Sequence, residues 1–447
     1  MQEFWHTNHI GVIYGGVNMN NLNNELLKFL DESPSRFHAV ANLGKMLEEA
    51  GYKRLSESYE WDLEEGGKYY VTRNGSALIA FRIPTASFKG FMMSASHSDS
   101  PSFHVKVNAE MTNSDGYVRI NTEKYGGCLI TPWMDRPLTV SGRLLVETEN
   151  GIETKLVYVD KDLLMIPNVA IHMNREVNDG FKYDPKCDSI PLFGLSESKG
   201  NFMKAVAEAA GVKEEAILGH DLFLCIRQKG FQWGSNDEFI SSAALDDLQC
   251  AFGCYKGFMN ATDSESVPMF VLFDNEEVGS STKQGADGTF LEEAVEKICG
   301  AFGVEKASAA ANSFMVSADN AHAVHPNHPE YADATHRPKM NGGIVIKHGT
   351  RYATDGASQA VFAAVCKKAG VPLQYFFNRS DLAGGGTLGN ISIAHVSLNT
   401  VDIGLPQLAM HSSIETGGSK DTEYLVKAMT QLYSMTFKEV NGTFTLK

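Results

Sequence analysis

The pattern of apolar and polar residues changes twice along the 447-residue sequence, and these changes restrict the folds that the chain can adopt. Residues 19–101 and 235–447 alternate helical apolar periods with short apolar strands, which is the pattern of an α/β fold. Residues 102–234 instead carry short alternating segments broken by glycine and polar turns, with one helical stretch near 203–210. We therefore predict an α/β domain, formed by 19–101 and 235–447, that is interrupted by a β-rich domain over 102–234.

Apolar periodicity divides the α/β parts into elements. The predicted helices span 21–51 (with a turn at 33–35), 241–259, 358–368 and 422–437. The predicted strands span 69–72, 77–81, 91–95, 267–273, 314–318, 343–347 and 395–402. This order predicts one layered sheet that the early strands complete across the insertion.

Composition narrows the class of partner and the compartment. A net charge of −15 and a pI of about 5.4 argue against nucleic acid, because binding phosphates requires a basic surface. No apolar run is long enough to predict a membrane span, and residues 1–18 lack the pattern of a signal peptide, while Met19 is an equally good start site. The seven cysteines are odd in number and irregularly spaced, which indicates free thiols, so we predict a cytoplasmic protein.

Two adjacent glutamates, Glu276 and Glu277, follow the predicted strand 267–273. Side chains alternate in direction as a chain leaves a strand, so one carboxylate can bind a ligand while the other faces a neighbouring cavity. A solvated surface pair is the ordinary alternative for two glutamates. The end of a buried strand favours a functional site, because α/β sheets bind ligands there.

Four further segments place polar side chains in the same context, next to strand ends or at a helix start. They contain His97 with Asp99, Asp246 with Asp247, Asp319, and His411. Each alone has a simpler explanation, since Asp246 is also a candidate helix N-cap, Asp319 a turn residue and His411 an interior histidine. Together they predict a shared site at one edge of the sheet.

Histidine nitrogens and carboxylate oxygens without a thiolate suit zinc, cobalt or manganese, and zinc is the usual choice for hydrolysis. A bridging carboxylate allows two ions, and a glutamate that is not a ligand can act as a general base. The histidines of 322–328 are a rival metal site. Their spacing of three residues and the nearby Pro326 and Pro329 exclude a helical zinc motif, so we predict a loop that lines the pocket.

Five motifs in order resemble the aspartyl aminopeptidase family of di-zinc metallo-aminopeptidases. They are HSDSP at 97–101, LDDL at 245–248, DNEEVGS at 274–280, SADNAHAVHPN at 317–327 and QLAMHS at 407–412. The segment ESPSRFHAV at 32–40 is similar to the N-terminal signature of that family. The resemblance extends from Met19 to the C-terminus.

The resemblance implies a zinc-exopeptidase-like fold, in which a central mixed sheet flanked by helices is interrupted by a β-rich oligomerisation domain. It also implies a homododecamer built from dimers and two Zn²⁺ ions in each subunit, with Co²⁺ or Mn²⁺ as alternatives. One ion would bind His97 and Asp319, and the other Glu277 and His411, with Asp246 as the bridge. Glu276 would be the general base, Asp99 would orient His97, and the peptide bond between Asp246 and Asp247 would be cis.

The same resemblance implies how a substrate is recognised. His172 would reach the active site of a neighbouring subunit, and Lys347 would face an acidic substrate side chain, although a strand-end lysine in water is the alternative. His322, Tyr352 and the glycine-rich loop 381–389 would line the pocket. The predicted activity is removal of N-terminal Asp or Glu from small peptides. A neutral or broad aminopeptidase, a deacylase or carboxypeptidase on the same metal fold, and a non-enzymatic assembly-forming binding protein are the alternatives.

Overall fold

The computed structural model describes residues 19–382, 384–386 and 388–447. Its largest sheet has nine strands, of which the four central neighbours β13, β4, β14 and β18 run parallel. In spatial order the strands are β1 (Lys53–Arg54), β2 (Lys68–Arg73), β3 (Ala77–Arg82), β13 (Val267–Phe273), β4 (Phe91–His97), β14 (Phe314–Ala318), β18 (Asn399–Gly404), β16 (Ile344–His348) and β17 (Leu373–Phe377). Segments on both sides of the insertion therefore alternate within one sheet, as predicted.

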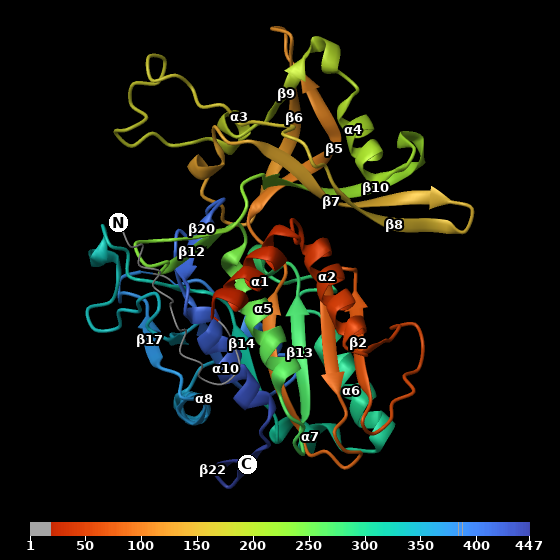
Figure 1. The fold of residues 1–447 in the computed structure, drawn as a ribbon, viewed down its shortest axis with the longest axis vertical. Coiled ribbons are helices and arrows are strands. Elements are labelled where there is room, and N and C mark those ends of the chain that lie inside the picture. Colours follow the sequence, from red (N-terminus) through yellow and green to blue (C-terminus); the bar gives the residue numbers. More distant parts are fainter. Residues whose placement is uncertain (1–18, 383, 387) are drawn as a thin grey trace, which may run out of the picture.

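Helices cover both faces of this sheet (Figure 1). One face packs against α1 (Met19–Asp31), α2 (Arg36–Glu49), α5 (Leu245–Asn260), α8 (Gly356–Ala369) and α10 (Asp421–Tyr433). The other packs against α6 (Phe290–Phe302), α7 (Lys306–Ala311) and α9 (Leu388–Ser392). Strand β13 illustrates how one strand contributes to the cores on both faces. Phe270 and Leu272 belong to the core on the first face and Val271 and Phe273 to the core on the second, because side chains alternate along a strand.

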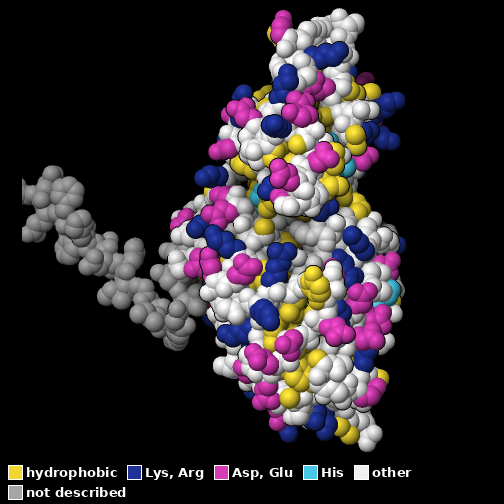
Figure 2. All heavy atoms as spheres, turned by 90° about the vertical axis from the view of Figure 1, so that its right-hand side faces the viewer, with side chains coloured by type: hydrophobic (Ala, Val, Ile, Leu, Met, Phe, Trp, Pro, Cys, Tyr) yellow, Lys and Arg dark blue, Asp and Glu magenta, His cyan; other side chains and the backbone are white. Residues whose placement is uncertain are grey.

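A second, six-stranded sheet lies above the first in Figure 1 and has its own core. Its order is β8 (Gly151–Tyr158), β7 (Leu138–Thr148), β10 (Ile217–Ile226), β5 (Ser102–Thr112), β6 (Tyr117–Tyr125) and β9 (Leu192–Leu195), and every pair is antiparallel. The helices α3 (Pro185–Asp188) and α4 (Phe202–Ala210) accompany it. Figure 2 shows acidic and basic side chains interspersed over one face of the molecule, with hydrophobic side chains between them.

Two small sheets complete the described chain. One has the order β11 (Phe231–Trp233), β12 (Phe239–Ser242), β20 (Glu415–Gly418), β19 (Pro406–Leu408) and β15 (Ala321–His322), and the other pairs β21 (Phe437–Val440) with β22 (Thr443–Leu446). Along the described residues, no helix combines the length and the apolar character that a membrane crossing needs.

This architecture confirms the predicted α/β fold class and corrects some boundaries. The helix predicted over 241–259 begins at Leu245, because the preceding residues pair as β12. The strand predicted over 395–402 is β18, and the closing helix ends at Tyr433, where the β21–β22 hairpin takes over. The domain boundaries at 101/102 and 234/235 stay predictions, and the question of residues 1–18 lies outside the described chain.

Candidate metal centre and active site

Parallel strands bring the predicted site residues to one edge of the large sheet. His97 is the last residue of β4, Asp319 directly follows β14, and Glu276 begins a 3₁₀ turn shortly after β13. The carboxyl ends of parallel neighbours meet at the same edge, which is where α/β sheets bind ligands. Asp246 reaches this edge from the first turn of α5, and His411 from the turn after β19.

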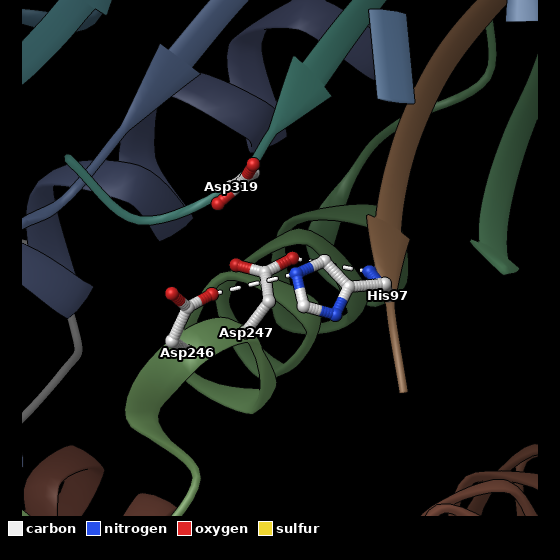
Figure 3. Close-up of side chains that lie close together, drawn as sticks. All are labelled: His97, Asp246, Asp247 and Asp319. Carbon is white, nitrogen blue, oxygen red and sulfur yellow. Dashed lines mark hydrogen bonds and ion pairs between the residues drawn. The ribbon is translucent and has the colours of Figure 1, made fainter. Parts of the chain in front are cut away.

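The first cluster at this edge contains His97, Asp246, Asp247 and Asp319, which are all buried (Figure 3). Each offers one ligand atom, and these atoms lie within 4.8 Å of one another. His97 Nε2 lies 3.4 Å from Oδ1 of Asp246, and Asp247 Oδ2 accepts the backbone N–H of His97 at 3.1 Å. The cluster therefore includes the three residues predicted for one metal ion, and it adds Asp247.

The second cluster contains Asp246, Glu277 and His411, again with ligand atoms within 4.8 Å of one another. A third group takes His97 from the first cluster and Glu277 from the second, and adds Glu276. His411 Nε2 lies 3.4 Å from Glu277 Oε2 and 3.7 Å from Asp246 Oδ2. Asp246 therefore belongs to both clusters, with Oδ1 near His97 and Oδ2 near His411. This is the arrangement expected of a bridging carboxylate.

Buried carboxylate oxygens that accept no hydrogen bond indicate that these residues suit a cation. Oδ1 of Asp246 and Oε1 of Glu277 are buried and accept no hydrogen bond from the described residues. Burying carboxylate oxygens without partners is costly, and a divalent ion removes that cost. Imidazole nitrogens with carboxylate oxygens form a donor set that binds zinc. The residues present thus fit zinc on their own chemistry.

Asp99 contacts both His97 and the adjacent glutamates Glu276 and Glu277. Its backbone oxygen lies 3.0 Å from His97 Nδ1, and its Oδ1 lies 3.4 Å from the same nitrogen. Its two carboxylate oxygens accept the backbone N–H groups of Glu276 at 3.1 Å and Glu277 at 3.2 Å. Tyr125 donates its hydroxyl to Oδ2 at 2.6 Å. Asp99 therefore does more than orient His97, because it also fixes the backbone of the glutamate pair.

Comparisons with known proteins agree with a zinc hydrolase. Residues 29–433 match the family described as aminopeptidase I zinc metalloprotease (M18). A probable M18 family aminopeptidase 2 of Clostridium acetobutylicum is 44% identical over 424 residues, covering 92% of this chain and 98% of the relative. The chain belongs to the M18 family of zinc aminopeptidases.

Solved structures support the same assignment for this M18 aminopeptidase. Ape4, in a cryo-EM structure of its complex with Nbr1, is 32% identical with a TM-score of 0.90 over 93% of this chain and 86% of that one. The S. cerevisiae mApe1 dodecamer is 30% identical with a TM-score of 0.81 over 93% and 97%. Family membership makes the chain a zinc-dependent hydrolase and favours an aminopeptidase over the deacylase, carboxypeptidase and non-enzyme alternatives.

Glu276 has a raised pKa that suits proton transfer. Burial, together with the Asp319, Asp99 and Asp246 carboxylates and against the opposing effect of His97, raises the pKa of Glu276 to about 8. A side chain whose pKa lies near neutrality is an efficient general acid and base. This pKa reflects the protein groups alone, and a cation nearby would lower it.

The sequence did not reveal Glu415, which positions residues of both clusters. This buried side chain accepts the backbone N–H of Asp246 at 2.9 Å and that of His411 at 2.6 Å. Glu415 lies on β20, where no local motif distinguishes it, so only the folded chain shows its role. The cis peptide bond predicted between Asp246 and Asp247 is present.

The predicted pocket residues lie around one cavity of about 210 Å³ beside the metal centre. Lys347, His322 and Tyr352 line it, together with Gly385 and Gly386 of the glycine-rich loop. The alternative that Lys347 faces water is wrong, because the residue is 4% exposed. Its Nζ lies 3.5 Å from Asp319 Oδ1 and 5.9 Å from the ring centroid of Tyr352.

Two histidine predictions have different outcomes. His325 and His328 line a neighbouring cavity of about 390 Å³ that shares His322 with the first. Neither belongs to a group that could hold a metal among the described residues. His172 lies in an exposed turn and is absent from the lining of the catalytic cavity, so its predicted role depends on a second subunit.

Proposed function

We propose that this M18 aminopeptidase removes N-terminal Asp or Glu from small peptides with a pair of zinc ions. The observation that carries the proposal is Asp246, shared between two ligand clusters beside a cavity that contains a buried lysine. His97 and Asp319 would hold one ion, Glu277 and His411 the other, and Asp246 both. When bound, the ions polarise the scissile carbonyl and lower the pKa of the attacking water.

Glu276 is the general base in this proposal. Its carboxylate takes a proton from the attacking water and delivers it to the nitrogen of the leaving peptide. Asp99 prepares this step, because its carboxylate holds the backbone N–H groups of Glu276 and Glu277. The two glutamates therefore have different tasks, since Glu277 is assigned to metal binding.

Lys347 accounts for the acidic specificity. Its ammonium is buried in the cavity wall and has Asp319 as a partner at 3.5 Å. Despite the opposing effect of burial, Asp319 and other nearby groups hold the pKa of Lys347 above its usual range, so it is charged at neutral pH. A charged lysine in the first pocket favours an Asp or Glu side chain through a charge-assisted hydrogen bond.

The Lys347→Met variant tests this specificity. Methionine keeps much of the length of the side chain but removes its charge, so kcat/KM for Asp and Glu substrates should fall about 100-fold. Leu substrates should lose less than about threefold, because they make no charge-assisted contact. Assays with aminoacyl substrates after zinc reconstitution measure both. An equal loss on acidic and apolar substrates would reject the acidic pocket and favour broad specificity.

Assembly forms the second part of the proposal. The S. cerevisiae mApe1 neighbour is a dodecamer, and we assign the same state, built from dimers, to this chain, with 102–234 as the oligomerisation domain. His172 would complete the site of a neighbouring subunit. Its loop exposes Val169, Ile171 and Met173, the last at 84%, and apolar side chains gathered on a surface mark interaction sites. The compartment stays the predicted cytoplasm, in keeping with seven free cysteines.

A further inference from the structure

The segment Tyr125 to Leu129 leaves the six-stranded sheet and runs against the metal centre. A Cβ on Gly126 would lie 3.1 Å from Cβ of Glu277, and one on Gly127 would lie 3.2 Å from Nδ1 of His411. The backbone N–H of Leu129 donates to the carbonyl oxygen of His411 at 2.9 Å. The β-rich insertion thus touches two residues assigned to metal binding within one chain, and glycines allow this close approach.

Tyr125, at the end of β6, begins this segment and makes three hydrogen bonds through its hydroxyl. The hydroxyl donates to Asp99 Oδ2 at 2.6 Å. It accepts from Arg36 Nη1 at 2.6 Å and from Asn275 Nδ2 at 2.9 Å. Its donor and acceptor capacity is therefore fully used, and one atom connects the insertion, α2 and the loop after β13.

Arg36 contacts Tyr125 through its guanidinium group, which also lies over the tyrosine ring. The guanidinium carbon lies 4.2 Å from the ring centroid of Tyr125 and 4.5 Å from that of Phe223, which also belongs to the insertion. Nη1 additionally donates to Asp274 Oδ1 at 2.7 Å. Arg36 and Asp274 are both buried, so this ion pair is shielded from water. The ring cannot move without disturbing these contacts.

We propose that Tyr125 is a positioning residue through which the β-rich insertion sets the geometry of the catalytic glutamates. Its hydroxyl orients the Asp99 carboxylate, and that carboxylate holds the backbone N–H groups of Glu276 and Glu277. The inference rests on the proposed role of Glu276 as general base. Small displacements of a catalytic group are costly, because a misplacement of about 1 Å lowers turnover by about 100-fold.

The Tyr125→Phe variant removes only the hydroxyl and keeps the ring beside Arg36. Because loss of a supporting hydrogen bond typically lowers activity 10- to 100-fold, we expect kcat to fall by about that factor. KM and the zinc content of the reconstituted enzyme should stay within about twofold of wild type, because the substrate pocket and the metal ligands are unchanged. Tyr117→Phe, on the same strand at a residue that is 44% exposed, is the matched control and should leave kcat unchanged.

A double-mutant cycle with Asp99→Asn shows whether Tyr125 acts through Asp99. If it does, adding Tyr125→Phe to Asp99→Asn lowers kcat much less than it does in the wild-type background. Wild-type kcat in Tyr125→Phe, additive losses in the cycle, or a loss explained by missing zinc or dissociated subunits would each overturn the inference. Glu276→Gln, assayed in parallel, separates the two proposals: if it stays active, the general-base assignment itself fails.

Discussion

At the scale of single residues, Glu415 links the two ligand clusters from outside the lining of the catalytic cavity. It accepts backbone N–H groups from Asp246 and from His411, so it fixes the shared residue and one residue of the second predicted ligand set. Burial raises the pKa of its carboxyl strongly, with the Asp246 carboxylate adding to the effect. Two donors converge on it, so its two oxygens are both required as acceptors.

Glu415→Gln should weaken metal binding while leaving the fold intact. The amide NH₂ group of glutamine cannot accept an N–H, so one of the two backbone donors loses its partner. We expect a 10- to 100-fold lower zinc affinity, which is typical when a residue that orients ligands is changed. Zinc titration of the metal-free variant with a competing chelator measures this. Glu423→Gln, outside the site on α10, is the control, and equal zinc affinities of wild type and Glu415→Gln would contradict the role.

The residues that gather in the two clusters could be predicted from sequence as one site, because each lies in a short motif next to an apolar strand or at a helix start. His97 and Asp319 are examples, since one ends β4 and the other follows β14. Glu415 and Tyr125 could not be predicted, because each role needs a partner distant in the sequence: Asp246 lies 169 residues from Glu415, and Asp99 lies 26 residues from Tyr125. The sequence also could not show that Lys347 is buried, because its partner Asp319 is distant in the sequence.

At the scale of elements, hydrophobic periodicity predicted the central strands well and the ends of elements less well. Strands β13 and β14 match their predicted ranges, because each is a short, fully buried apolar run. The region before α5 was predicted as helix, but Phe239–Ser242 pairs with β20 instead. The pairing of β12 with β20, more than 170 residues apart in the sequence, overrides the local helix propensity of these residues. The same pairing places Glu415 beside the candidate metal centre.

The end of β6 is the part of the insertion that reaches the candidate site. The six-stranded sheet was predicted only as a β-rich insertion, and its Tyr125–Leu129 segment nevertheless contacts Asp99, Glu277 and His411. Through Tyr125, which bonds Asp99 and Asn275, the insertion has the proposed role of positioning the loop after β13 within its own subunit. That role is separate from the oligomerisation we assign to it.

At the scale of the whole molecule, variants of His172 test whether active sites are shared between subunits. His172→Ala and Glu276→Gln should each be inactive as homo-oligomers. Co-expressed, they should regain part of the wild-type activity, because a chain with intact Glu276 can receive His172 from a Glu276→Gln neighbour. Activity of purified mixed assemblies on an Asp substrate measures this. Mixed assemblies that stay as inactive as their parents would contradict sharing.

In the proposed mechanism, the adjacent glutamates divide metal binding and proton transfer between them. The most direct test compares Glu276→Gln with Glu277→Gln by zinc content and turnover after reconstitution. We predict that Glu276→Gln keeps two zinc ions per chain and loses at least about 100-fold in kcat, as expected for removal of a general base. Glu277→Gln should lose zinc as well as activity. Substantial turnover in Glu276→Gln, or loss of its zinc, would contradict the account.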